Sequence, residues 1–359
     1  MTQRERQILQ WIMEDPMISQ EALAERAGIT RSSVAVHISN LMKKGYIAGK
    51  GYVLRTGGYV AVAGAVNVDI GGRSHAPLVA RDSNPGSVTI SLGGVGRNIA
   101  HNLRLLGAEV SLLTALGEDV HAGEVMSSCE SLGIDLSAAL RVPGGTTSTY
   151  LFLSDQDGDM ALAVSDMEIY RQLTPAYFAR HLGVLNGAKL IVADANLPAE
   201  SLAYLAEHCR PPLFVDPVST IKGEKLRPIL GKIHTLKPNR LEAELLSGVP
   251  ITDRASLERA AACLLDTGLT RVFISLGEEG VFAAEQGQAV LVPACPAQVR
   301  NATGGGDAFT AALAWSWLEG QSLEDSARAA VAAAAIAVEG EKTINPVLSP
   351  EGVRGRMQK

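Results

Sequence analysis

The sequence predicts an α/β protein with a doubly wound parallel sheet and a small helical domain in front of it. The chain has 359 residues, more than one domain usually holds, and 47% of them are hydrophobic. Only 4% are aromatic and 36 residues are glycine, which favours aliphatic packing and tight turns over an aromatic-rich β-sandwich. From residue 59 onward, short aliphatic runs alternate with helical stretches. Right-handed crossovers between such strands produce a parallel sheet covered on both faces.

The first 55 residues differ in charge and pattern from the rest. The whole chain has a formal charge of −6, but this segment holds eight Lys and Arg against five acidic residues. Its pattern predicts two helices, the second capped by Ser19, then a turn at 27–30, a third helix at 31–44 and a hairpin at 45–54. The inner face of the third helix is expected to hold Val34, Ile38, Leu41 and Met42. This order predicts a winged helix-turn-helix in residues 1–56 and a second domain in 57–359.

The amino-terminal segment resembles the short DNA-binding modules at the front of many bacterial regulators, through its pattern from Leu23 to Val34. The resemblance implies that the third helix enters the major groove and that Lys50, in the wing, contacts the DNA backbone. The residues expected to face bases or phosphates are Thr30, Arg31, Ser32, Ser33 and His37. A net charge of +3 neutralises few phosphates, so binding at physiological salt needs a dimer. The alternative is a fold reused for packing between domains or subunits.

The larger domain divides into alternating elements with two interruptions. Expected strands are 59–63, 110–115, 190–193, 213–215, 235–236 and 272–275. Expected helices are 97–106, 121–132, 198–208, 240–247, 256–267, 308–318 and 323–338. The segments near 72–92 and 147–165 break the alternation, and the second contains a hairpin turn at 154–159. These two segments therefore stand apart from the doubly wound pattern.

The most informative motif is the glycine run that leads to Asp307. Three glycines ahead of a helix, Gly304, Gly305 and Gly306, let backbone N–H groups converge on an anion, and the helix dipole adds positive potential. A carboxylate beside bound phosphate is repelled unless it has a role, and the obvious role is to accept a proton from an attacking hydroxyl. The alternative is a glycine-rich turn in which Asp307 is a solvated residue of the first helical turn.

Other site classes are disfavoured by the sequence. No G-x-x-x-x-G-K-[ST] occurs, and the glycine after the first strand lacks the G-x-G-x-x-G spacing of a dinucleotide-binding turn. The four cysteines are far apart, which argues against a zinc site or a disulfide scaffold and favours a reducing cytoplasm. No leader peptide and no apolar run long enough to span a bilayer are recognised, so we expect no membrane partner.

Five ordered motifs resemble those of the ribokinase-like (PfkB-type) family of sugar and nucleoside kinases. They begin at Gly64, Gly93, Lys237, Ser275 and Asn301, and the likeness covers roughly residues 58 to 346. Within that family the stretches at 82–86, 93–100, 216–219 and 234–244 are similar to bacterial pseudouridine kinases. One departure is Gly305, because the family usually has Ala between the two other glycines. The looser backbone should cost some preorganisation without removing an N–H donor.

The resemblance implies a kinase that uses ATP and Mg²⁺, in a family where many members also bind a monovalent cation such as K⁺. It also implies that the segments near 72–92 and 147–165 form a small β-sheet lid over the sugar, of a kind that often mediates homodimers. It assigns catalysis to Asp307 and the three glycines before it, and metal and phosphate contacts to Asn239 and Glu242. The residues implied at the sugar are Asn67, Asp69, Gly93, Gly94 and Asn98. Those implied at the nucleotide are Ser275, Gly277, Gly280 and Asn345. Asn239 and Glu242 also fit a helix-capping box, and the two roles are compatible.

The identity of the substrate depends on the resemblance. Pseudouridine, whose 5′-hydroxyl would be phosphorylated, has a free N1–H, and a site that accepts this hydrogen would disfavour uridine. Candidate acceptors in the lid segments are Ser83, Asn84 and Asp166. The rival substrates are another nucleoside such as inosine, or a free sugar such as ribose. The rival class of function is a transcription regulator whose kinase-like body senses a nucleoside or sugar.

Overall fold

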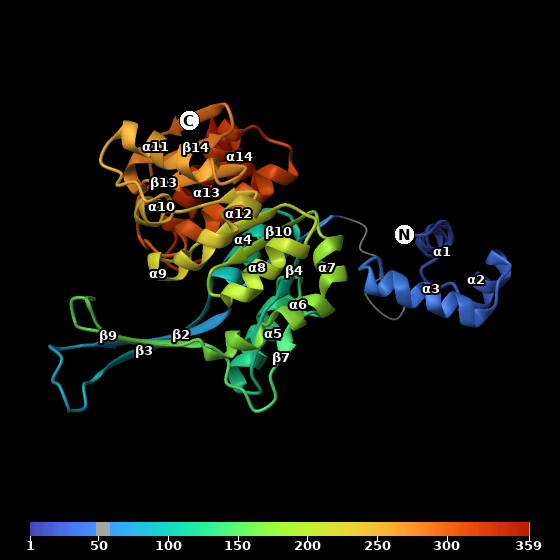
Figure 1. Cartoon of the computed structure of the whole chain (residues 1–359). Coiled ribbons are helices and arrows are strands. Elements are labelled where there is room, and N and C mark those ends of the chain that lie inside the picture. Colours follow the sequence, from blue (N-terminus) through green and yellow to red (C-terminus); the bar gives the residue numbers. More distant parts are fainter. Residues whose placement is uncertain (48–57, 359) are drawn as a thin grey trace.

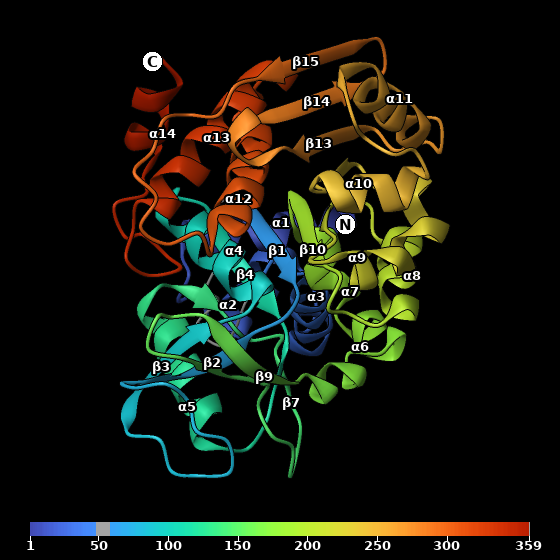
Figure 2. The ribbon, with the colours of Figure 1, turned by 90° about the vertical axis from the view of Figure 1, so that its left-hand side faces the viewer.

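A nine-stranded sheet forms the centre of the larger domain in a computed structural model that describes residues 1–47 and 58–358 (Figures 1 and 2). Its strand order is β15-β14-β13-β12-β11-β10-β1-β4-β6. Seven of these strands are parallel, namely β1 (Tyr59–Ala63), β4 (Glu109–Leu113), β6 (Ile134–Asp135), β10 (Leu190–Asp194), β11 (Leu213–Asp216), β12 (Thr235–Leu236) and β13 (Arg271–Ser275). An antiparallel hairpin of β14 (Val281–Glu285) and β15 (Gln288–Val292), which we did not expect, extends one edge.

Helices cover both faces of this sheet, as a doubly wound fold requires. Alternate residues of β1 enter different cores, because Val60 and Val62 belong to one buried cluster and Ala61 and Ala63 to the other. The first cluster is covered by α4 (Val95–Leu105), α5 (Val120–Ser131), α12 (Gly305–Leu318), α13 (Leu323–Val338) and α14 (Pro350–Met357). The second is covered by α6 (Pro175–Arg180), α7 (Leu182–Gly187), α8 (Ala199–His208), α10 (Arg240–Ser247) and α11 (Arg254–Leu265).

The helices and strands expected in the larger domain are all present, with ends moved by a few residues. Helices α10 and α13 have the expected bounds, whereas the strand expected at 110–115 is broken at Thr114 into β4 and β5 (Ala115–Leu116). Smaller elements complete the domain: β7 (Leu140–Arg141), α9 (Thr220–Gly223) and the 3₁₀-helices η1 (Glu168–Gln172), η2 (Glu224–Lys232) and η3 (Gly277–Glu279).

A separate four-stranded sheet, the lid, projects from the body (Figure 1). Its order is β3-β2-β8-β9, built from β2 (Asn67–Ser74), β3 (Gly86–Gly93), β8 (Thr149–Ser154) and β9 (Met160–Asp166). The lid begins earlier than the expected segment from residue 72, because β2 starts at Asn67. Asn67 and Asp69 therefore lie on a lid strand and not in a turn after β1.

One face of the lid is aliphatic and uncovered. Strand alternation and the register place a row of large apolar side chains on this face, opposite the face that carries Asp69. The exposed members are Val88, Ile90, Leu151, Leu153, Leu162 and Val164, here called the aliphatic lid face. Contiguous apolar surface of this kind usually marks an interaction site.

The amino-terminal helices form their own small core. Helices α1 (Gln3–Glu14), α2 (Gln20–Ala27) and α3 (Arg31–Lys43) pack around Ile8, Ile12, Leu23, Val34, Ile38 and Leu41. Ser19 caps α2 as expected, whereas Met42 is 42% exposed, so its expected place on the inner face is wrong. The hairpin expected at 45–54, including Lys50, lies for the most part outside the described residues.

The end of α3 meets the larger domain through backbone. A Cβ at Gly183 in α7 would lie 1.6 Å from the carbonyl oxygen of Lys43, so only glycine permits this approach. Gly45, which follows α3, is close to the Gly183 carbonyl and to the Tyr59 hydroxyl at the start of β1. Across the described residues, no helix is long and apolar enough to cross a membrane.

Candidate active site

Asp307 lies in the first turn of α12. The helix begins at Gly305, earlier than the expected Ala308, so two of the three glycines belong to the helix. Gly304 is the N-cap residue with φ of 84°, and a Cβ there would lie 2.0 Å from the Thr343 carbonyl oxygen. The first N–H groups of a helix have no partner within the helix. The glycine run therefore ends in a compact set of backbone donors beside a carboxylate, at the positive end of the helix dipole.

A hydrogen bond from α4 orients the Asp307 carboxylate. The Asn98 side chain donates from Nδ2 to Oδ2 of Asp307 at 2.8 Å. Burial raises the pKa of Asp307 to about 7, and the charge of Asp216 acts in the same direction, against the Asn98 hydrogen bond and Lys237. A carboxyl with a pKa near neutral is well suited to general-base catalysis at physiological pH.

A lysine adds positive charge to the amide donors. Nζ of Lys237 lies 3.2 Å from Oδ2 of Asp216, and a Cβ at Gly306 would lie 3.2 Å from the same nitrogen. The Thr310 hydroxyl also donates to Asp216, at 2.9 Å. Burial works to lower the pKa of Lys237, but Asp216 and Glu242 raise it above its ordinary value. The ammonium is therefore charged and sits where transferred phosphate oxygens would approach.

Sequence reasoning gave no role to Lys237, Asp216 or Asp194. The signal was present, because Asp194 ends β10, Asp216 ends β11 and Lys237 follows β12. Ligands of open α/β sheets bind at the carboxyl ends of the strands, so polar residues at these three positions are candidates by topology alone.

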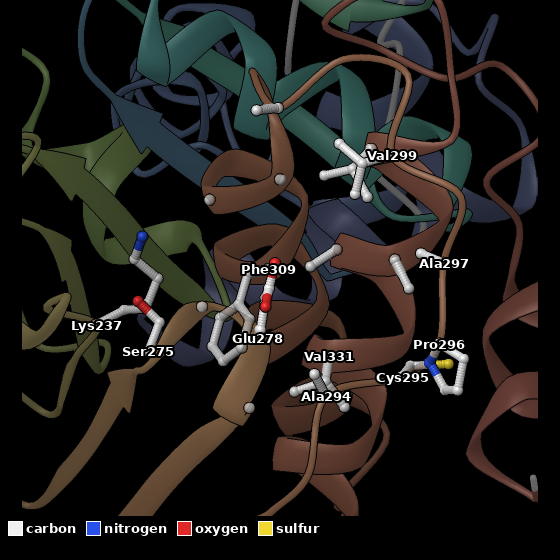
Figure 3. Close-up of a pocket in the computed structure, with 18 residues that line it drawn as sticks. Lys237, Ser275, Glu278, Ala294, Cys295, Pro296, Ala297, Val299, Phe309 and Val331 are labelled. Atoms are coloured by element: carbon white, nitrogen blue, oxygen red, sulfur yellow. The ribbon is translucent and has the colours of Figure 1, made fainter.

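A cavity of about 560 Å³ opens beside Gly305 and Gly306 (Figure 3). Ser275, Gly277 and Gly280, the residues expected at the nucleotide, line it. Lys237 and Ser275 stand at one end in Figure 3, and the far side is apolar, built from Ala294, Pro296, Ala297, Val299 and Val331. The shape suits a flat heterocycle with its phosphates directed at the glycine run.

Asn345 is not among the residues that line this cavity. Its side chain is buried, donates to the Ile336 carbonyl at 2.6 Å and accepts from the Val347 N–H at 3.3 Å. It borders a second cavity near Glu339 and Lys342. The side chain thus holds the turn after α13, and the structure does not bring it to the nucleotide cavity.

The residues expected at the sugar gather where the lid joins the body. Asn67 donates from Nδ2 to Oδ1 of Asp69, and Gly93 is the register partner of Asn67 on β3. A Cβ at Gly93 would lie 2.2 Å from Oδ2 of Asp69, and Gly94 has φ of 95°, so both positions require glycine. Burial raises the pKa of Asp69 to about 6, against Asn67 and Arg97. Helix α4 starts at Val95, directly after Gly94, and carries Asn98 in its first turn. The residues expected at the sugar are therefore joined to Asn98 by a short stretch of chain.

The three lid residues proposed to accept the base N1–H lie elsewhere. Asp166 is exposed, and the register with Thr149 and Val68 places it on the lid face opposite Asp69. Asn84 uses its side chain within its own loop, accepting from the Val79 N–H and donating to the Val79 and Asp82 carbonyls. Ser83 lies exposed in the same loop. The structure brings none of them to Asp69.

Asn239 and Glu242 form a reciprocal capping box at α10. The Asn239 N–H donates to Oε2 of Glu242 at 2.8 Å, and the Glu242 N–H donates to Oδ1 of Asn239 at 2.9 Å. Burial raises the pKa of Glu242, against the Asn239 backbone bond and Lys237. Among the described residues, Oε1 of Glu242 makes no hydrogen bond. One free hard oxygen fits a hydrated Mg²⁺ better than a closed cage.

The expected DNA-contacting residues lie at the start of α3. Arg31 and Ser32 are exposed, and Arg31 pairs with Glu21 at 3.1 Å. Thr30 caps the helix, accepting from the Ser33 N–H at 3.2 Å. His37 is half-buried, and its Nδ1 has no partner among the described residues.

The chain belongs to the pfkB family of carbohydrate kinases. The family profile matches residues 58–350, and that of a winged helix-turn-helix DNA-binding domain matches residues 1–48. The larger domain is thus a phosphotransferase of the sugar and nucleoside kinase class, with the predicted ribokinase-like fold and a winged helix-turn-helix ahead of it.

Two relatives from Escherichia coli (strain K12) share about two fifths of the sequence. The uncharacterised sugar kinase YeiI is 40% identical over 98% of both chains. A pseudouridine kinase is 41% identical over 82% of this chain and 95% of its own. Among solved structures, a putative sugar kinase from Clostridium perfringens is 32% identical with a TM-score of 0.78, covering 85% of this chain and 96% of its own. Arabidopsis thaliana ribokinase, solved with ribose and ATP, has the same fold at 23% identity and TM-score 0.76, covering 85% of this chain and 100% of its own.

Proposed function

We propose that this protein transfers the γ-phosphoryl group of ATP to the 5′-hydroxyl of a ribosyl nucleoside, with pseudouridine as the first candidate. The observation that carries the proposal is the Asp307 carboxylate, which Asn98 orients beside the free amides of α12. The identity with a pseudouridine kinase over 95% of that enzyme supports the choice of substrate.

In the proposed reaction Asp307 accepts the proton of the 5′-hydroxyl while that oxygen attacks the γ-phosphorus. The bond to the β,γ-bridging oxygen breaks and ADP leaves. The N–H groups of Gly304, Gly305 and Gly306, together with Lys237, stabilise the charge on the transferred group. Asp69 and Asn67 hold the sugar hydroxyls, because a carboxylate that accepts two hydrogen bonds selects a vicinal diol.

Mg²⁺ bound to ATP would neutralise phosphate charge, and Glu242 and Asn239 would hold its water ligands. A monovalent cation such as K⁺ belongs to the same proposal by family likeness. The residues described above do not single out a site for a monovalent cation. The four cysteines are free, which fits the proposed cytoplasmic setting.

Steady-state kinetics with ATP and a panel of pseudouridine, uridine, inosine, ribose and fructose test the proposal. We expect the highest kcat/KM for pseudouridine. A preference for inosine or ribose would show that pseudouridine is not the main substrate, while the proposed phosphoryl transfer from ATP would stand. Absence of ATP turnover with every member would favour the rival function, a regulator that senses a nucleoside or sugar.

We also propose that the chain forms a homodimer through the aliphatic lid face and binds a DNA operator through α3. The lid face has six large apolar side chains at least 40% exposed, and a second copy of the same face would cover them. A dimer also supplies the two helix-turn-helix modules that a weakly charged domain needs for affinity.

A further inference from the structure

A strained turn follows β11, next to the candidate active site. Val218 has φ of 67°, a left-handed conformation that is costly for a β-branched residue. Its N–H donates to Oδ1 of Asp216 at 2.9 Å, and Ser219 then caps α9 (Thr220–Gly223). Residues held in such conformations cluster at ligand sites, where surrounding contacts maintain the strain. The turn places Lys222 beside the end of the neighbouring strand.

Lys222 is a half-buried cation without a contacting counter-ion. Its ammonium donates to Oδ1 of Asn196 at 2.6 Å and contacts Sδ of Met167 at 3.4 Å. Among the described residues no carboxylate lies within ion-pair distance of it, and one of its three protons has no partner. Burial lowers the pKa of Lys222, with the more distant Asp194 opposing that effect. A desolvated donor with a free proton is costly unless a ligand completes it.

The position of this pair is set by the strand ends and the lid. Asn196 follows β10, and its N–H donates to Oδ1 of Asp194 at 2.9 Å. The other oxygen of Asp194 accepts from the Ala65 N–H, just before the sugar residue Asn67. Met167 directly follows lid strand β9, and α9 lies on the side of the body that faces the lid (Figures 1 and 2). Lys222 is thus connected through Asn196 and Asp194 to the segment that leads into the expected sugar site.

We propose that Lys222, anchored by Asn196, is the specificity subsite for the nucleoside base and donates a hydrogen bond to a ring carbonyl oxygen. The inference rests on the proposed nucleoside kinase function and deepens it. The Asn196 carbonyl is occupied by Lys222, so the pair offers donors and needs an acceptor. Pseudouridine, uridine and inosine carry ring carbonyls. Adenosine presents an amino group, whose N–H donors would oppose the ammonium, and a free sugar presents no base.

The experiment compares Lys222→Met, which keeps length and removes the donor, with Lys232→Met as the matched control. Lys232 lies close by in the sequence but pairs with Glu207 on the surface at 2.8 Å. Binding of pseudouridine and adenosine without ATP is measured by calorimetry, and KM and kcat are measured with pseudouridine and ribose. We expect Lys222→Met to weaken pseudouridine about tenfold to a hundredfold, the range for a hydrogen bond to a charged group. Adenosine binding and ribose KM should stay unchanged, as should every value for Lys232→Met.

The outcomes separate the two proposals. If the native enzyme phosphorylates pseudouridine and Lys222→Met has native KM and affinity, the subsite is wrong and the kinase function stands. If pseudouridine binds in a Lys222-dependent way but is never phosphorylated, the subsite stands and the function is wrong. An equal loss for adenosine, ribose and pseudouridine would assign Lys222 to the structure of the turn and overturn the subsite. A native enzyme that neither binds nor phosphorylates any nucleoside overturns both.

Discussion

Asn98 and Asp307 meet through one hydrogen bond of 2.8 Å, although 209 positions separate them in the sequence. Replacing Asn98 with Ala should lower kcat about tenfold to a hundredfold, because the carboxylate loses its orienting donor. The control is Asn102→Ala, one turn further along α4, whose side-chain atoms have no partner among the described residues. Steady-state kinetics of both folded variants check this. Equal losses in the two would show that packing of α4 matters and the contact does not.

Asp307→Asn should cost roughly two to four orders of magnitude in kcat, the usual range for a general base. Nucleotide affinity should change little, since the amides and Lys237 remain. Single-turnover kinetics separate chemistry from binding, and circular dichroism verifies the fold. Near-native turnover would contradict the assigned base.

The pH dependence follows from the raised pKa of Asp307, about 7. The base works only when ionised, so kcat/KM, which reports groups of the free enzyme, should fall as pH decreases through about 7. Asp216 raises this pKa, so Asp216→Asn should move the acid limb to lower pH. Lys237 lowers it, so Lys237→Met should move the limb to higher pH. The measured quantity is the pH at which kcat/KM falls on the acid side, independent of the maximum kcat/KM of each variant. Shifts in the same direction for both variants would contradict the electrostatic account.

The aliphatic lid face should hold two copies together. Replacing Leu162 and Val164 with Lys puts two charges on this face and should convert a dimer into monomers. Ser87→Lys is the control, because Ser87 is exposed on the opposite face of the lid. Light scattering after size exclusion gives the mass. A native monomer, or a double variant that remains dimeric, would rule out this interface.

Arg31 should contribute a phosphate contact. Its ion pair with Glu21 is highly exposed and worth little, so DNA can replace it. With duplexes selected from a random pool, Arg31→Ala should weaken binding about equally across sequences and lower the salt slope by about one. Arg171→Ala, on the larger domain, is the control. If no duplex is enriched from the pool, the helix-turn-helix serves in packing and does not bind DNA.

The elements of the larger domain were predictable because each buried strand is a short aliphatic run and each helix has a period and a cap. The glycine motif also located the start of α12 to within a few residues. The β14–β15 hairpin was missed, since its pairing is set by the neighbouring edge of the sheet and not by local pattern.

Prediction of the site was less complete for a reason of topology. Asp307, Asn98 and Asp69 stood in recognisable motifs, and the structure connects them. Sequence reasoning gave no role to Lys237, which follows β12, or to Lys222, which lies in α9 after β11. Only the sheet order brings the ends of these strands together. Sequence reasoning could not place Asp166 on the lid face opposite Asp69, because a shift of one residue on a strand exchanges the faces of the lid.

The glycine contact between α3 and α7 separates the helix-turn-helix domain from the candidate active site. It lies at the amino end of β1, whereas Asp194, Asp216 and Asp307 gather at the opposite, carboxyl edge of the sheet. In the proposed dimer, a change at the lid of one subunit therefore has no direct path to that subunit's own α3. A signal from the proposed nucleoside site to the proposed DNA-binding helix would have to travel along the length of the sheet's strands or pass through the second copy of the proposed dimer.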